Sequence, residues 1–405
     1  MITLLTTALA VLFWLSLALI VYTYLLFPLV IFLRARLAPS PYKKAVQEPN
    51  VSLVMAMHNE EESLPAKLEN LQSLDYPRQR LEIIIASDGS TDRTNEILQS
   101  INDSRYQVLL LPRVGKANAL NSAVERAQGQ ILVFSDANSM YAPYAIRRLV
   151  APFADPNVGG VAGNQRYLPS QRNNLSQTGE KSYWNFDRML KTYESQAGSV
   201  VSATGSIYAL RRSLFQPIVE GVTDDFYTST AAIEQGYRLV FEPDAVSFEP
   251  VSADAEREFK RKVRIITRGL RSVIARSALL NPASYGFYSL QLFSHKVLRR
   301  LVVFPLLLLF VTSLLLAWTG PFYALAAVGQ AAFYAAAALG FFVRRSRKRI
   351  LKLASLPFYF TMVNVASMIA VFNIMRGSQI ARWEPQRVEA AATNTGSTAA
   401  RTADK

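Results

Sequence analysis

Cysteine is absent from the 405 residues of the chain, and histidine occurs only twice, as His58 and His295. The chain therefore has no disulfide, no thiolate metal ligand and no cysteine nucleophile. A zinc site built from nitrogen and sulfur ligands is nearly excluded as well. A bound metal ion would have to be held by oxygen atoms, which favours Mg²⁺ or Mn²⁺.

Charged residues are absent from three long stretches, residues 1–33, 301–343 and 353–373. Each is long enough to cross a hydrocarbon core of about 30 Å, which needs about 20 helical residues. The middle stretch is interrupted by Thr319-Gly320-Pro321, which predicts two spans joined by a tight turn. The first stretch has no basic start and is longer than the apolar core of a signal peptide, which favours an uncleaved anchor.

Acidic residues are too few to balance the basic ones, and the formal net charge is +14. A basic chain can bind nucleic acid, but here the basic excess lies beside the apolar segments, so we expect no nucleic-acid partner. The positive-inside rule predicts a multi-pass protein of the cell membrane with its soluble domain in the cytoplasm. The same residues can attract anionic membrane lipids. They are Arg34, Arg36, Lys43, Lys44, Lys296, Arg299, Arg300, Arg344, Arg345, Arg347, Lys348, Arg349 and Lys352.

The last apolar segment conflicts with this rule. Basic residues precede it, and Arg376, Arg382 and Arg387 follow it. If the segment spans the membrane, its two flanks lie on opposite sides and cannot both be cytoplasmic. Either the rule fails at this point or residues 353–373 are re-entrant, and the sequence leaves both possibilities open.

Five parts follow from the distribution of apolar and polar residues. About 250 residues of ordinary soluble composition separate the first two apolar regions, enough for one globular domain. The end of the chain is rich in Ala and Thr and is expected to be disordered. The parts are a transmembrane anchor (1–36), a cytoplasmic catalytic domain (48–280), a membrane-interface segment (281–300), C-terminal transmembrane helices (301–376) and a tail (377–405).

Strand-like and helix-like segments alternate within the soluble domain. The strand-like segments are 51–57, 81–86, 106–111 and 131–134, and the helical ones are 60–74, 91–101 and 116–127. This alternation predicts an α/β fold with a mostly parallel sheet. Ligands of such sheets bind at the carboxyl ends of the strands. Polar clusters lie at those ends, at His58-Asn59-Glu60, Asp88–Asp92 and Asp136–Asn138.

Two of the polar motifs suit a nucleotide. Asp88 follows a strand and precedes Gly89-Ser90. It can belong to a turn that caps the next helix, or its carboxylate can bind a base or ribose. Lys116 begins a helix after Gly115, where its charge opposes the helix dipole. A bound phosphate would offset that cost, although a solvated surface lysine is an equal alternative.

Two further motifs suit a metal ion and a base. Asp136 and Asn138 are two residues apart after a strand, so their side chains share one face and can supply two oxygen ligands. An Asx turn is the simpler interpretation. Asp224 and Asp225 precede a helical stretch, where they can cap the helix or include a general base.

The order of these motifs is more specific than any one of them. Asp-Gly-Ser-x-Asp at 88–92, Gly-Lys-x-x-Ala-Leu-Asn at 115–121, Asp136-x-Asn138, Thr204-Gly205-Ser206 and Asp224-Asp225 follow one another. Together they resemble family 2 of the inverting glycosyltransferases, which has the GT-A fold, over roughly residues 51–274. The nearest resemblance is to membrane synthases of polysaccharides and glycolipids. Arg376-Gly377, Trp383 and Arg387 resemble the closing motif of those synthases.

The resemblance implies a role for each motif. His58, Asn59 and Glu60 would line the nucleotide, Asp88 would bind its base, and Lys116, with Asn121 behind it, would lie near the nucleotide. Asp136, with Asn138, would hold Mg²⁺ or Mn²⁺. Thr204, Gly205, Ser206 and Asp224 would lie under the donor and acceptor sugars, and Asp225 would be the catalytic base. The implied donor is a nucleotide-diphosphate sugar, with a UDP-sugar favoured, and the acceptor is a carbohydrate or a lipid.

Two positions depart from the family pattern. Asn138 replaces the second aspartate of the usual metal-binding pair. Processive synthases carry Gln-x-x-Arg-Trp after the base, whereas residues 265–269 here are Ile-Ile-Thr-Arg-Gly. Arg268 alone is retained, one helical turn after Arg264, and the pair can grip a diphosphate or line a membrane-surface helix.

Three functions fit these features. The first is extension of a polysaccharide, for which so few spans would need an oligomer or a secretion partner. The second is a single transfer of sugar to a lipid, which the loss of the Gln-x-x-Arg-Trp pattern favours. The third is an inactive membrane sensor that binds nucleotide sugars, against which the retained Asp225 argues.

Overall fold

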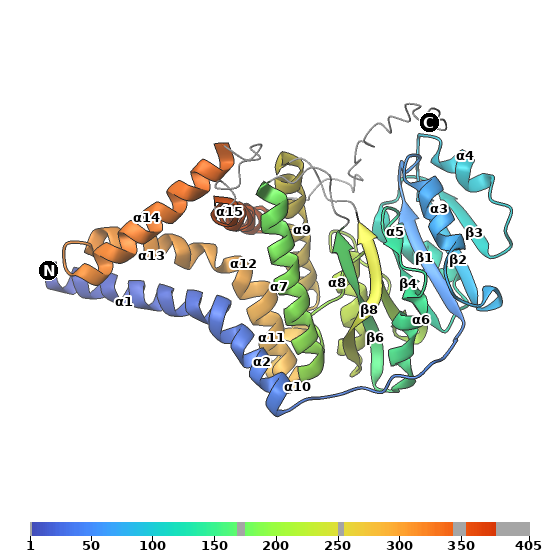
Figure 1. The fold of residues 1–405 in the computed structure, drawn as a ribbon, viewed down its shortest axis with the longest axis horizontal. Helices are drawn as coiled ribbons and strands as arrows, with labels where there is room; N and C mark the ends of the chain where they lie inside the picture. Colours follow the sequence, from blue (N-terminus) through green and yellow to red (C-terminus); the bar gives the residue numbers. More distant parts are fainter. Residues whose placement is uncertain (1, 168–174, 250–254, 343–353, 378–405) are drawn as a thin grey trace, which may run out of the picture.

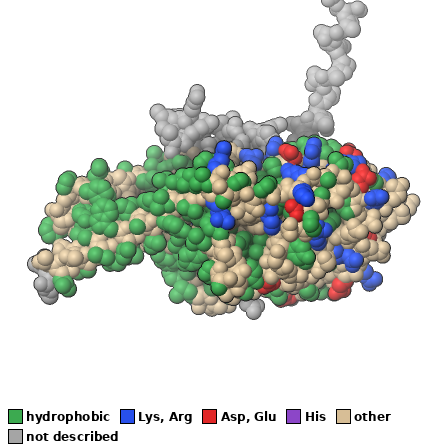
Figure 2. All heavy atoms as spheres, turned by 90° about the horizontal axis from the view of Figure 1, so that it is seen from below, with side chains coloured by type: hydrophobic (Ala, Val, Ile, Leu, Met, Phe, Trp, Pro, Cys, Tyr) green, Lys and Arg blue, Asp and Glu red, His purple; other side chains and the backbone are tan. Residues whose placement is uncertain are grey.

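The computed structural model describes residues 2–167, 175–249, 255–342 and 354–377. A sheet flanked by helices forms one part of the molecule, and long helices from both ends of the chain form the other (Figure 1). Hydrophobic side chains cover the helical part, while Lys, Arg, Asp and Glu gather over the sheet part (Figure 2). Trp383, Arg387 and the predicted disordered tail lie outside the described residues.

The sheet has eight strands in the order β3-β2-β1-β4-β7-β6-β8-β5. Strands β1 to β4 run parallel to one another, as predicted, whereas β7 and β5 pair antiparallel to their neighbours, so the sheet is mixed. The strands are β1 Val51–Met57, β2 Leu81–Asp88, β3 Tyr106–Leu111, β4 Ile131–Phe134, β5 Met140–Tyr141, β6 Val158–Tyr167, β7 Tyr208–Arg211 and β8 Arg238–Glu249.

Helices cover both faces of this sheet because alternate strand residues point to opposite sides. Leu53 and Met55 of β1 pack in one apolar core with α3 (Leu64–Gln72), α4 (Thr94–Gln99) and α6 (Ala145–Val150). Val54 and Ala56 pack in the other core with α5 (Lys116–Arg126) and α8 (Asp224–Glu234). Short 3₁₀ turns lie at Arg78–Arg80, Ala151–Ala154, Arg212–Leu214 and Ser277–Leu280.

Three of the four predicted strands have the predicted bounds, while helices α3 and α4 begin later than predicted. The chain before each helix forms turns, because side chains there bind backbone amides of the neighbouring loop. Asp92, for example, accepts from the amide of Glu61 in the neighbouring loop at 3.3 Å and from the amide of Thr94, where α4 begins, at 3.0 Å.

The helical part contains three described helices long and apolar enough to cross a membrane: Thr3–Leu37, Pro321–Phe342 and Ser355–Met375. A fourth candidate is the pair Phe287–Leu301 and Val303–Leu316, which is bent by 50°. The remaining helices of both parts are α1 Ile2–Val21, the π-helix η1 Tyr22–Leu26, α2 Phe27–Leu37, α7 Leu175–Ala197, α9 Ala255–Ala275, α10 Pro282–Tyr285, α11 Phe287–Leu292, the π-helix η6 Phe293–Leu298, α12 Arg299–Leu301, α13 Val303–Leu316, α14 Pro321–Phe342 and α15 Ser355–Met375.

Direct bonds join the two parts. Tyr288 and Gln291 of α11 donate to the carbonyls of Val201 and Ser199 at 2.8 and 2.7 Å. Arg34 of α2 donates to the carbonyl of Ala197 at 3.3 Å. The sheet domain is therefore held directly against the helices that carry the apolar segments.

Candidate active site

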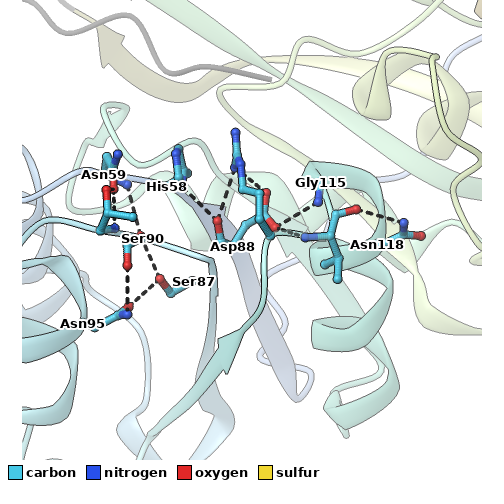
Figure 3. Close-up of polar contacts among 11 residues, drawn as sticks. His58, Asn59, Ser87, Asp88, Ser90, Asn95, Gly115 and Asn118 are labelled. Carbon is cyan, nitrogen blue, oxygen red and sulfur yellow. Dashed lines mark hydrogen bonds and ion pairs between the residues drawn. The ribbon is translucent and has the colours of Figure 1, made fainter. Parts of the chain in front are cut away.

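The predicted site residues converge at the carboxyl ends of β1, β2 and β4, beside the first turns of α5 and α8. Figure 3 shows the part around Asp88, where loops from β1, β2 and the start of α5 meet. Parallel strands place their carboxyl ends at one edge of the sheet. The chain order of the strands therefore brings distant motifs together.

Asp88 is fully buried at the end of β2. One carboxylate oxygen accepts from the amides of Val114 and Gly115 at 2.6 and 2.9 Å. The other pairs with Arg113 at 2.5 Å. In this conformation Asp88 shapes the loop that leads into α5, and its contact with a nucleotide base stays a prediction. Arg113 was not among the predicted residues.

The loop after β1 is bonded to the loop after β2. Asn59 has a left-handed backbone, with φ at 55°, and its side-chain oxygen accepts from the amide of Thr91 at 2.7 Å. The amide of Glu60 donates to the hydroxyl of Thr94 at 2.8 Å. Nδ1 of His58 bonds to the carbonyl of Asp88 at 2.8 Å. The predicted nucleotide-lining loop is therefore rigidly attached to the loop that carries Asp88.

Lys116 is the centre of the site. Its Nζ lies 2.8 Å from Oδ1 of Asp136 and 3.0 Å from Oδ2 of Asp224. Burial favours the neutral amine, but the two carboxylates outweigh it and raise the pKa of Lys116. Lys116 therefore stays protonated and holds both acids beside it. The side chain of Asn121 is bonded to Ile218 instead. It accepts from the amide of Ile218 at 2.8 Å and donates to the carbonyl of Ile218 at 3.0 Å.

Asp224 and Asp225 form the first turn of α8. Burial and the charge of Asp224 raise the pKa of Asp225, against the opposing charges of Lys296 and Lys116. Asp225 also accepts from the amide of Phe226 at 2.8 Å. The result is a carboxylate more basic than an ordinary aspartate, which suits a general base.

Arg268 also belongs to this group. It lies on α9, where burial lowers the pKa of its guanidinium and the charge of Asp224 acts in the opposite direction. Asp224 therefore faces cations from both α5 and α9. The structure brings Lys116, Asp136, Asp224, Asp225 and Arg268 together, and the roles expected for them stay predictions.

The Thr204-Gly205-Ser206 segment adjoins Asp136. A Cβ on Gly205 would lie 3.1 Å from Oδ2 of Asp136, so a side chain there would crowd the carboxylate. Among the described residues, the buried hydroxyls of Thr204 and Ser206 have no hydrogen-bond partner. Buried polar groups are rarely left without partners, and these two suit a ligand rich in hydroxyls.

A buried polar cluster lies beneath the loop that carries Asp136, and sequence reasoning missed it. Lys67 is fully buried; its Nζ donates to the hydroxyl of Ser135 at 2.8 Å and to the carbonyl of Ser139. The hydroxyl of Ser139 donates to Glu249 at 2.6 Å. A lysine on the apolar stripe of α3, between Leu64 and Leu71, was the available signal.

Burial controls the charge of this cluster. It lowers the pKa of Lys67 to about 7, although Asp136 and Glu249 act in the opposite direction. Burial, together with the charge of Asp136, raises the pKa of Glu249 to about 7. Both groups therefore titrate near neutral pH while they hold the loop of Asp136 from inside.

The predicted metal ligands are few. Among the described residues, no three His, Asp or Glu side chains form a group that could hold a metal ion. Asp136 and Asn138 lie on a partly exposed turn, in which the amide of Ser139 donates to the carbonyl of Asp136 at 3.2 Å. The extended segment expected to place both side chains on one face is therefore not formed, and the pair offers one carboxylate and one amide. This pair fits Mg²⁺ or Mn²⁺ that takes its other ligands from a diphosphate and water, which is the usual mode for Mg²⁺ at phosphate sites.

Known proteins share this architecture. Residues 52–219 match the family described as glycosyl transferase family 2. A mannosyltransferase from Pyrobaculum calidifontis, solved with GDP-Man and Mn2+, superposes with a TM-score of 0.69 at 24% identity, over 91% of this chain and 99% of that chain. These findings define the fold as GT-A.

The curated relatives are similar over the same domain. Poly-beta-1,6-N-acetyl-D-glucosamine synthase of Staphylococcus aureus (strain COL) is 27% identical over 221 residues, which is 53% of each chain. Probable glycosyltransferase YdaM of Bacillus subtilis (strain 168) is 26% identical over 218 residues, 50% of each chain. The match thus spans about half the length of these relatives. Residues 52–219 therefore form a glycosyl transferase family 2 domain, as the motif order predicted.

Proposed function

We propose that the protein transfers a sugar, with inversion, from a nucleotide-diphosphate donor to a growing polysaccharide or a membrane glycolipid. The observation that carries this proposal is the group around Lys116. This lysine joins Asp136 and Asp224 in ion pairs, and Asp225 with its raised pKa lies next in the chain. Buried hydroxyls without partners adjoin the group.

In the proposed reaction, Asp225 takes the proton from the acceptor hydroxyl as that oxygen attacks the anomeric carbon. The bond to the diphosphate breaks, and the diphosphate leaves with the nucleotide. Lys116 and Arg268 offset its negative charge and hold it in place. A divalent ion bound at Asp136 and Asn138 would add positive charge at the leaving group. Direct displacement needs no covalent intermediate.

Two features bear on the acceptor. The similarity to poly-beta-1,6-N-acetyl-D-glucosamine synthases supports a polysaccharide. The sequence at residues 265–269, which lacks the Gln-x-x-Arg-Trp pattern, supports a single transfer to a lipid. Both acceptors require the same site, and both suit an enzyme whose apolar helices keep it at the cytoplasmic side of a membrane.

A donor screen tests the proposal. Purified full-length protein in detergent is given UDP-, GDP- and dTDP-sugars with Mg²⁺ or Mn²⁺, with and without lipid or oligosaccharide acceptors, and released nucleotide diphosphate is measured. We expect release from at least one donor, and no comparable release by the Asp225→Asn variant. Tight binding of a nucleotide sugar without turnover under any condition would instead identify an inactive sensor.

A further inference from the structure

Helix α15 differs from the other long apolar helices in how much of it is covered. Over the 18 most apolar consecutive residues of α15, 39% are buried, compared with 11% in Thr3–Leu37 and 17% in α14. A helix that crosses a bilayer beside two or three others exposes most of its surface to lipid. Protein instead surrounds much of α15.

The catalytic domain supplies part of this cover. Ala366 and Ala370 of α15 pack in one cluster with Ile266 and Leu270 of α9. Tyr359 lies under Lys262 of α9, with Nζ 5.9 Å from the ring centroid. Because α9 also carries Arg268 to the active site, α15 lies directly against the catalytic domain.

The apolar helices cover α15 from the other direction. Phe360 contacts Tyr24 of η1 and Phe333 of α14, with ring centroids 5.5 and 5.6 Å apart. A Cβ on Gly340 would lie 2.6 Å from the carbonyl oxygen of Ala354. The last turns of α14 therefore meet the start of α15. The two helices join at the end of α14 that is nearer the catalytic domain.

The direction of α15 separates it from the spans. Figure 1 shows α15 nearly end-on, whereas α1, α13 and α14 run along the page away from the sheet domain. Helices α7 and α9 also run crosswise to α1 and α13. If α1, α13 and α14 cross the bilayer, α15 lies parallel to its surface.

We propose that α15 lies in the cytoplasmic surface of the membrane, in contact with lipid headgroups, and does not cross the bilayer. The helix is apolar on all sides, which suits one side packed on α9 and the other facing lipid, where the exposed residues Leu356, Phe372 and Met375 would enter the boundary between headgroups and acyl chains. Exposed Arg376 and the basic residues before the helix would then all be cytoplasmic, which removes the conflict with the positive-inside rule. The placement is independent of the transfer activity.

Labelling of single cysteines tests this placement, because the wild-type chain contains none. Arg345→Cys, Arg376→Cys and Gly320→Cys are each exposed, in intact and in opened cells, to a maleimide that cannot cross membranes. Full reactivity is measured after detergent is added. We expect positions 345 and 376 to react only in opened cells and position 320 to react in intact cells. Opposite sidedness of 345 and 376 would overturn the proposal.

A depth measurement separates a surface helix from a re-entrant one. Nitroxide labels are attached at Val365→Cys, in the middle of α15, and at Val311→Cys, in the middle of α13, in the reconstituted full-length protein. Accessibility to oxygen and to a polar relaxation agent gives the depth of each label. We expect headgroup depth at 365 and central depth at 311. A label at 365 near the bilayer centre would refute the surface placement.

Discussion

Replacing Asp225 with asparagine keeps the size of the side chain and removes its ability to accept a proton. The amide of Phe226 can still donate to the side-chain oxygen, as it now does at 2.8 Å, so α8 should begin unchanged. The ion pairs of Lys116 with Asp136 and Asp224 do not involve the side chain of Asp225, so both remain after the replacement. Donor binding should therefore stay near the wild-type value.

General-base catalysis contributes about 10²–10⁴-fold to the rate. At 1.36 kcal/mol for each factor of ten, this corresponds to about 3–5 kcal/mol of the activation barrier. We expect transfer by Asp225→Asn to fall by that factor, measured as initial rates at saturating donor. Nucleotide affinity is measured in parallel by calorimetry.

Asp224→Asn is the matched control, and it makes a second, sharper test. The charge of Asp224 helps to raise the pKa of Asp225 above its ordinary value of 3.8. Without that charge the pKa of Asp225 falls, so the base stays ionised at lower pH. The acid limb of kcat/KM should move to lower pH in this variant, and transfer near neutral pH should fall much less than in Asp225→Asn.

Two results would refute the assignment. If Asp225→Asn keeps more than about a tenth of the wild-type rate, the loss of rate is too small for the removal of a general base. An acid limb that stays in place, or moves to higher pH, in Asp224→Asn would show that the titrating group is not Asp225.

Three further predictions use other parts of the molecule. Activity should require Mg²⁺ or Mn²⁺ and be lost in EDTA and in Asp136→Ala; full turnover in EDTA would contradict the metal role. A cysteine at Gly320 should react with an impermeant maleimide in intact cells and one at Arg345 should not; the reverse pattern would invert the topology. Lys67→Met should lower transfer, because Lys67 holds the loop of Asp136 through Ser135 and Ser139; an unchanged rate would contradict that role. The pKa of Lys67 is about 7 in the fold and 10.5 as its ordinary value. Its contribution to stability is therefore present above pH 10.5 and lost as pH falls through about 7. Thermal unfolding in detergent should show wild-type stability rising between pH 7 and 9, and that rise should be smaller in Lys67→Met; an equal rise in both would show that Lys67 is not the group responsible.

The parallel half of the sheet could be predicted from the sequence because its strands are short, continuous apolar runs. The other half could not. Strand β6 contains Gly159, Gly160 and Gly163 together with polar Asn164 and Gln165, so neither propensity nor alternation marks it. Its glycines are explained only by neighbours from distant segments: a Cβ on Gly159 would lie 2.6 Å from side-chain atoms of Leu214 and Tyr237.

For the site, the sequence identified the motifs but not the contacts between them. The ion pairs from Lys116 to Asp136 and Asp224 depend on the order of strands in the sheet, which no local pattern contains. Arg113 and Lys67 were missed for the same reason, since their partners come from other elements. A charged residue on an apolar helical stripe, as at Lys67, is the one local signal that pointed to such a partner.

The bonds between the loops after β1 and β2 have a consequence for how such a pocket can diverge. Asn59 and Glu61 accept from the backbone amides of Thr91 and Arg93 at 2.7 and 2.9 Å, and Thr94 accepts from the amide of Glu60. Every residue except proline offers the same backbone N–H donor, whatever its side chain. Among relatives, substitution at the donating positions should therefore be free, and substitution at the accepting positions should be restricted. The preference for one nucleotide sugar over another can then change in small steps while these bonds preserve the shape of the pocket.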